Sequence, residues 1–286
     1  MNLYLLQVIN GVGIGLLYFL IAVGLSIIFG LLRLVNFAHG VFYMAGAYLA
    51  YAAVDSWNLN FWVALAVVPC VAFVAALVLE RLLIRRAYGL SHTAQILLTF
   101  GLAMIMQEGA IMIWGTDGLH MSTPGALAGV VQWGDFIYPK YRLFVMGFTA
   151  VLACVLWWLL ERTRLGSIVR GGSEYKDMMA LLGHDVPAVF MLVFGLGAAL
   201  AALAGMLAAP IRGVEPFMGV EALSVAFVIV VIGGMGSFAG AMIGGLLVGV
   251  LQSVLSSAWP ALAQPVIYIC MLGVLLMRPH GLLGRG

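Results

Sequence analysis

The chain has 286 residues, of which 64% are hydrophobic and only 8% charged, and its formal net charge is +2. Soluble domains are typically close to half apolar and a quarter charged, so this composition excludes an ordinary soluble fold and indicates a polytopic membrane protein. The small net charge gives no reason to expect nucleic acid as a partner.

The cysteines and the N-terminal composition give no sign of a disulfide, a metal site or a cleaved signal. Cys70, Cys154 and Cys270 lie inside apolar runs, where a free thiol packs as a small hydrophobe, so neither a disulfide nor a metal site is expected. Residues 1–32 contain no Lys or Arg and therefore lack the basic start of a cleaved signal. We expect them to belong to the mature protein.

Apolar runs follow one another along the chain, and most reach the roughly 20 residues that a helix needs to cross a membrane. We predict an all-α fold, a polytopic transmembrane helical bundle of eight or nine spans that forms a single domain over residues 1–286. The predicted spans are 11–31, 36–54, 60–80, 93–114, 142–160, 187–209, 221–234, 238–257 and 262–277. Because 221–234 is short and glycines follow it, we expect a broken or re-entrant helix near 221–240.

Basic residues orient these spans. If the spans alternate, ten of the 13 Lys and Arg residues fall on one side, which the positive-inside rule assigns to the cytoplasm. Only Lys140, Arg142 and Arg212 fall on the other side. The longest outer loop, about 115–141, is polar and turn-rich and too short for a separate domain.

Small residues recur at intervals of four in two predicted helices, at Gly197, Ala201 and Gly205 and at Gly236, Gly240 and Gly244. Such spacing lets helix backbones approach closely in lipid, so we interpret both sets as packing surfaces.

A polar segment, residues 161–186, interrupts the apolar chain and holds eight of its 24 Asp, Glu, Lys and Arg residues. Ser173 as N-cap and Gly183 after the last turn predict a short helix over about 174–182. Its apolar side chains share one face, which suits either the lipid surface or a groove in a partner protein. The residues alone leave both readings open.

Several blocks of sequence then point to a known family. They are Leu34–Gly40, Ala45–Tyr48, Arg164–Arg170, Met179–Gly183, Phe194–Gly205, Val231–Gly240 and Arg278–Gly284. In content and order they resemble the branched-chain amino acid ABC permease family over nearly the whole chain. The run Asn36–Gly40 looks more like the first of that family's two permease subunits than the second.

The resemblance implies a subunit of an ATP-driven importer in the bacterial plasma (inner) membrane, moving branched-chain or related apolar amino acids. Its implied partners are a second permease subunit, two cytoplasmic ATPase subunits and an extracytoplasmic substrate-binding protein, besides membrane lipid. ATP and magnesium would be bound by the ATPase subunits. The chain's only lysines, Lys140 and Lys176, follow Pro139 and Tyr175, so it has no phosphate-binding loop and no enzymatic role is expected.

Within the same resemblance, the segment 161–186 becomes the cytoplasmic coupling loop that the ATPase grips. The residues expected to take part are Arg164, Gly166, Arg170, Glu174, Asp177, Met179, Ala180 and Gly183. The chain departs from the family pattern at Met179, where relatives usually have alanine four residues before the glycine.

Four polar residues are candidates for the translocation path: Asn36, His39, Glu108 and Ser237. For His39 a structural role, bonding a neighbouring carbonyl, is favoured over contact with substrate. Glu108 lies inside a span, where an ionisable side chain usually faces the bundle interior as a functional group. A position at a helix end, or a buried hydrogen bond to a neighbouring helix, explains it equally well. A loose similarity between Asn36–Gly40 and Ser237–Gly240 suggests a pair of equivalent broken segments.

Three other functions remain to be weighed. The family resemblance also allows a permease for urea, short amides or another small metabolite. A stand-alone channel or ion-coupled carrier is disfavoured because Glu108 is the one convincing intramembrane carboxylate. An intramembrane enzyme is disfavoured because no catalytic motif is found in the sequence.

Overall fold

The computed structural model describes residues 3–32, 36–133, 136–174, 176–183 and 185–284. The long helices are α1 (Leu3–Leu32), α3 (Phe61–Leu79), α5 (His92–Trp114), α6 (Lys140–Arg162), α9 (Val186–Arg212) and α11 (Phe238–Ala258). The shorter ones are α2 (His39–Tyr51), α4 (Arg85–Ala87), α7 (Arg164–Glu174), α8 (Lys176–Leu181), α10 (Met218–Gly233) and α12 (Pro265–Met277). The predicted helical membrane bundle is confirmed.

Local sequence explains where several of these helices begin. The side chains of Asn60, Ser91, Asp185 and Ser237 each accept a hydrogen bond from a backbone N–H in the first turn of α3, α5, α9 and α11. Such N-caps satisfy donors that have no partner inside the helix. The helix starts therefore follow from short-range chemistry that the sequence displays.

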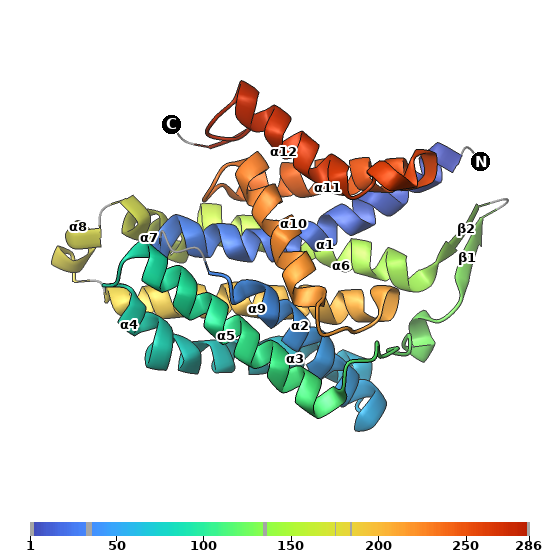
Figure 1. Cartoon of the computed structure of the whole chain (residues 1–286), viewed down its shortest axis with the longest axis horizontal. Coiled ribbons are helices and arrows are strands. Elements are labelled where there is room, and N and C mark those ends of the chain that lie inside the picture. Colours follow the sequence, from blue (N-terminus) through green and yellow to red (C-terminus); the bar gives the residue numbers. More distant parts are fainter. Residues whose placement is uncertain (1–2, 33–35, 134–135, 175, 184, 285–286) are drawn as a thin grey trace.

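Figure 1 shows the helices α1, α6 and α9 running roughly along the long axis of the molecule. The helices α7 and α8 lie at one end of this axis, and the strands β1 (Val130–Trp133) and β2 (Phe136–Pro139) lie at the other. The N-terminus is at the end that carries the strands, whereas the C-terminus is at the end that carries α7 (Figure 1).

Six described helices are long and apolar enough to span a membrane, and α10 and α12 are shorter apolar helices. The helix α2 has 13 residues and continues as a π-helical turn, Ala52–Ser56. The predicted spans thus exist as helices, but the described chain does not contain nine long ones. The helix near 221–240 that we expected to be broken or re-entrant is α10, which has 16 residues, and α2 is a second short helix.

The first turns of α2 and α10 meet each other inside the bundle. A Cβ atom added to Gly40 would touch the carbonyl oxygen of Gly219, and one added to Gly219 would lie 2.7 Å from the carbonyl oxygen of Gly40. Around this contact α1 packs on α10 and α11, while α9 packs on α2 and α3. Two short helices whose first turns meet in the interior are typical of transporters built from broken helices. This contact joins α2 to α10, and the similarity between Asn36–Gly40 and Ser237–Gly240 stays a prediction.

Glycines set the distance between the central helices. Gly197 of α9 faces the backbone of Gly24 in α1, and Gly205 faces the backbone of Tyr43 in α2. In the second set, Gly240 packs against Gly233 at the joint between α10 and α11. Both predicted small-residue ladders are therefore packing surfaces, because a side chain at these contacts would overlap backbone.

The outer loop contains a feature that the all-α prediction missed. The strands β1 and β2 form an antiparallel hairpin in which Val130 pairs with Pro139. The hairpin is anchored by the hydroxyl of Tyr138, which donates a hydrogen bond of 2.9 Å to the side-chain oxygen of Asn10 on α1. A four-residue strand gives too weak an alternation to be read from sequence.

Candidate functional site

The helix α7 is fixed tightly to the end of α6. Gly166 is buried where a Cβ atom would overlap the Leu160 carbonyl, so the chain turns sharply there and only glycine fits. Arg170 donates a hydrogen bond to that same carbonyl and forms an ion pair of 3.4 Å with Glu161. Because both contacts lead back to the last turn of α6, a force applied to α7 would move α6 with it.

The helix α8 exposes apolar side chains at its end. Leu181 and Leu182 are 88% and 70% exposed. The sulfur of Met179 lies against Gly171 of α7, where a Cβ would be 3.1 Å away. Gly183 has φ of +84°, and its N–H donates to the Ala180 carbonyl at 3.0 Å, as a glycine that ends a helix does. The predicted role of Gly183 at the helix end is confirmed.

The short helix predicted over about 174–182 corresponds to α8, but its predicted N-cap is wrong because another helix, α7, precedes it. Ser173 lies within α7, which already begins at Arg164, so it does not cap the second helix. The run that begins at Arg164 continues the helical pattern through Gly171 and Gly172, two residues that sequence reasoning treats as helix breakers. Gly172 faces α1, where an added Cβ would lie 3.2 Å from the Leu31 side chain.

The remaining predicted coupling residues are distributed along the same segment. Arg164 opens α7 and is exposed, and Ala180 is exposed on α8. Glu174 ends α7 and Asp177 lies in α8, but their side chains lie outside the described part of the chain. The structure thus brings the predicted residues together on one projecting element.

Asn36 and His39 are buried at the start of α2 and contact backbone. The Asn36 side-chain oxygen accepts from the N–H of Ala38 at 3.1 Å, and His39 Nε2 bonds the Ile21 carbonyl at 3.0 Å. His39 Nδ1 and Asn36 Nδ2 have no partner among the described residues. Neither residue lines the two cavities described below, so their contacts agree with the favoured structural role and leave a path role as a prediction.

Ser237 caps α11 and lines a cavity at the α7 end of the bundle. Its hydroxyl accepts from the N–H of Gly240 at 3.0 Å. The cavity, about 310 Å³, also touches Arg170 of α7 and Ser26 of α1. It therefore connects the predicted coupling segment with the joint between α10 and α11.

The sequence led us to expect Glu108 in the bundle interior, but the structure does not place it there. It is exposed on the outer face of α5, on the same stripe as the exposed Leu97, Met104 and Met112. Residues at spacings of four, seven and eleven share one side of a helix. An ionisable group in an apolar stripe is costly against lipid, so the bundle of one subunit leaves this group without the environment it needs.

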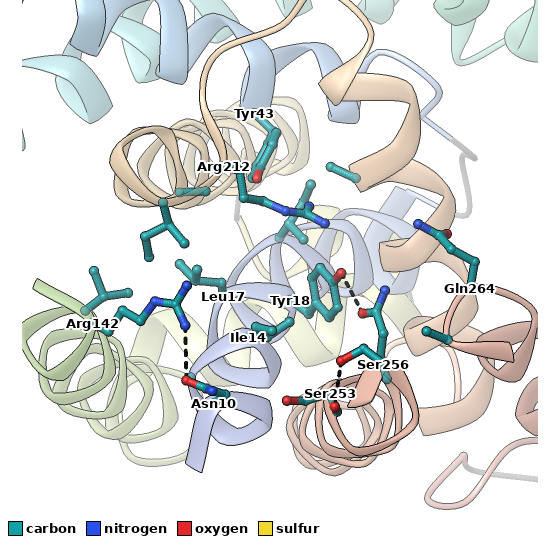
Figure 2. A pocket seen from close by; sticks show the side chains of 18 of the residues that line it. Asn10, Ile14, Leu17, Tyr18, Tyr43, Arg142, Arg212, Ser253, Ser256 and Gln264 are labelled. Carbon is teal, nitrogen blue, oxygen red and sulfur yellow. Dashed lines mark hydrogen bonds between the residues drawn. The ribbon is translucent and has the colours of Figure 1, made fainter. Parts of the chain in front are cut away.

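A second cavity, of about 420 Å³, opens at the hairpin end between α1, α6, α9 and α11. Figure 2 shows Arg212 beside Tyr43 on one wall. On another wall the Tyr18 hydroxyl donates a hydrogen bond of 2.9 Å to the side-chain oxygen of Gln252. Arg142 donates to Asn10 at 3.1 Å (Figure 2). Most of the wall is apolar, and no Asp or Glu occurs among the described residues that line it.

Sequence reasoning missed this cavity and a buried pair at the other end. It placed Arg212 on the outer side but did not identify Tyr43, which the structure places against it, as its neighbour. It also passed over Glu80, which is fully buried and accepts a hydrogen bond of 2.9 Å from the Tyr88 hydroxyl. The one available signal was a lone Glu at the end of an apolar span, which by itself does not identify a partner.

Comparison with known proteins decides the family. The family model described as the permease component of branched-chain amino acid transport systems matches residues 7–275. The chain belongs to this permease family. Across 99% of its length the permease is 32% identical to the high-affinity branched-chain amino acid permease protein BraD of Pseudomonas aeruginosa, covering 96% of that protein. It is 30% identical to LivH of Escherichia coli K12, with the same coverage of both chains. No solved structure gives a significant match.

These findings establish the general role of the permease. It is a multi-pass protein of the bacterial inner membrane and a transport permease of the branched-chain amino acid type. The resemblance of the sequence to this family is confirmed.

Proposed function

We propose that the permease is a membrane-spanning subunit of an ATP-binding-cassette importer for branched-chain or related apolar amino acids. The observation that carries the proposal is the pair of helices α7 and α8, which project at one end of the bundle with Leu181 and Leu182 exposed. An exposed apolar surface on a short helix suits a groove in a partner protein. The close match to BraD and LivH supports the substrate class.

The basic residues support a cytoplasmic position for this end. Among the described residues, Arg81, Arg85 and Arg86 follow α3 at the same end as α7, and Arg278 follows α12. Lys140 and Arg142 begin α6 at the hairpin end, where Arg212 also lies. The positive-inside rule then assigns α7 and α8 to the cytoplasm.

Coupling would run from the ATPase through α8 and α7 into the bundle. The close packing of Gly166 on the Leu160 carbonyl and the hydrogen bond of Arg170 to it hold α7 against α6. Movement of the docked helices would therefore be transmitted to α6. Two ATPase subunits would bind the ATP and magnesium, since this chain has no phosphate-binding loop. An extracytoplasmic binding protein would deliver substrate at the hairpin end.

The exposed face of α5 supports a second permease subunit as a partner. Glu108 lies there among apolar side chains, and a neighbouring protein can supply the hydrogen-bond donor or cation that lipid cannot. We assign this face to the contact between the two permease subunits. Single cysteines at Leu97 and Met104 should then cross-link to the partner, whereas a cysteine at Val151 of α6 should not.

The experiment that tests coupling replaces Gly183 with leucine in the assembled transporter. A side chain at φ of +84° is strained by about 1–2 kcal/mol, which changes the end of α8, and its Cβ would meet no described neighbour within 4 Å. We expect ATP hydrolysis to continue while uptake of leucine falls. Gly129→Leu is the matched control, because Gly129 has φ of +89° and open space in the outer loop. Unchanged uptake by Gly183→Leu would exclude the coupling role.

Transport assays separate this function from the alternatives. Uptake in liposomes that requires the ATPase subunits supports the importer, and uptake by the permease alone supports a channel or carrier. Competition by urea or short amides, rather than by leucine, isoleucine or valine, would identify the protein as a permease for those small metabolites instead.

A further inference from the structure

The cavity at the hairpin end has the size and wall of a ligand site. Small-molecule sites are typically about 300–1,000 Å³, mostly apolar, with a few fixed polar groups. This cavity is about 420 Å³, and its apolar part is formed by residues such as Ile14, Leu17 and Val145. Its polar groups come from five helices, α1, α2, α6, α9 and α11, and from β2 and Gln264, so the fold gathers them and no local motif does.

The charges on its wall have one sign. Arg212 and Arg142 line the cavity, and no carboxylate does so among the described residues. Arg142 is engaged by Asn10, a neutral partner, at 3.1 Å. Arg212 lies against the hydroxyl of Tyr43 and also feels the charge of Glu221, which stands outside the cavity in the first turn of α10.

Arg212 is the group that remains available to a ligand. Its guanidinium has five N–H donors, of which the neighbouring phenol can accept few. The described ion pairs do not include Arg212, and its side chain is exposed within the cavity. A cation held at such a place is stabilised by an anion that it can bond in a bidentate manner.

We propose that this cavity binds an anionic group carried on an apolar body, with Arg212 pairing with the anion. Two sources share this chemistry: a small free carboxylate, of which an amino acid is one example, and the phosphate of an anionic lipid. The mention of amino acids rests on the proposed function. The assignment of a ligand to a cavity within one subunit goes beyond that function.

Binding to the full-length permease alone, in nanodiscs of phosphatidylcholine, tests the first source. The probes are 4-methylpentanoate, its neutral amide and L-leucine, measured by isothermal titration calorimetry. We expect the carboxylate to bind at least roughly tenfold more tightly than the amide, because an amide cannot form the charged pair. This comparison needs no variant, so it does not depend on whether a substituted protein folds.

Variants then locate the effect. Arg212→Gln should weaken carboxylate binding at least roughly tenfold and leave amide binding unchanged, while Arg212→Lys should retain part of the difference. Lys140→Gln is the matched control, since Lys140 lies at the same end, is exposed and does not line the cavity. It should bind like the unmodified protein.

A second arm tests the lipid source. Nanodiscs with phosphatidylglycerol should lower the apparent affinity for the carboxylate, and native mass spectrometry should find that lipid retained by the unmodified permease and lost from Arg212→Gln. Either Arg212-dependent carboxylate binding or Arg212-dependent lipid retention supports the site. Equal binding of acid and amide, together with lipid retention that is independent of Arg212, would overturn it. Neither result requires ATPase partners, so failure here is distinct from failure of the importer function.

Discussion

Replacing Tyr88 with phenylalanine removes one hydroxyl from a buried contact and leaves the ring in place. In the structure this hydroxyl donates to Glu80 Oε1 at 2.9 Å, and the second carboxyl oxygen of Glu80 has no partner among the described residues. Glu80 is fully buried, so water cannot replace the lost donor. The Tyr88 ring packs edge to face on Phe190 at 5.8 Å, a contact that phenylalanine retains.

The expected loss follows from these contacts. Leaving a buried polar group without its partner costs about 1–3 kcal/mol, and the value for a carboxyl group lies toward the upper end. Since the apolar contacts of the ring are kept, the loss of stability should come almost entirely from the missing hydrogen bond. Denaturation of the purified permease with increasing SDS, followed by tryptophan fluorescence, should therefore show a free energy of unfolding lower by roughly 2 kcal/mol.

Two controls show whether the hydrogen bond is the cause. Tyr268→Phe makes the same chemical change on α12, at a side chain that is half exposed, and should leave stability unchanged. In a double-mutant cycle of Tyr88→Phe with Glu80→Gln, the coupling energy should exceed about 1 kcal/mol, because the two side chains interact directly. A Tyr88→Phe protein as stable as the unmodified one, or a cycle without coupling, would refute the reasoning.

The remaining predictions concern packing, pH and surface charge. Gly205→Ala should destabilise the fold by about 1–3 kcal/mol in the same assay, since its methyl group would overlap the Tyr43 backbone, whereas Gly147→Ala, in open space on α6, should be neutral or stabilising. Burial, followed by the nearby Glu80, raises the pKa of Tyr88 above its ordinary value near 10, so its contribution to stability is complete below pH 10 and is lost above it. Stability measured against pH should therefore fall above pH 10, and less steeply in Tyr88→Phe. Glu161→Gln should change stability by about 1 kcal/mol or less, because the ion pair with Arg170 is 50% and 41% exposed, and a larger loss would show that the pair is more than a surface contact.

Local chemistry made much of the fold readable from the sequence. Hydropathy alone located the membrane helices, because a helix must satisfy its own backbone within lipid. Gly183 was identified as the end of a short helix, since few other residues adopt its positive φ at low cost. The glycine ladders of α9 and α11 were identified as packing surfaces from their spacing alone.

The start of α7 and the hairpin were not readable in the same way. Gly171 and Gly172 have low helix propensity, and Gly172 lies close to Leu31, more than 140 residues away in the chain, a contact that the local sequence does not reveal. The strands β1 and β2 are too short to show a period, and they are held by the contact of Tyr138 with Asn10.

The sequence by itself determined that this protein is a helical membrane permease and where its polar segment lies, because composition, hydropathy and residue order along the chain carry that information. Only the tertiary structure decided that α2 and α10 meet at Gly40 and Gly219, that Glu108 faces outward and that Arg212 lines a cavity. Each of these depends on which helices become neighbours. That choice is made by long-range packing of backbone and side chains, which no single segment specifies.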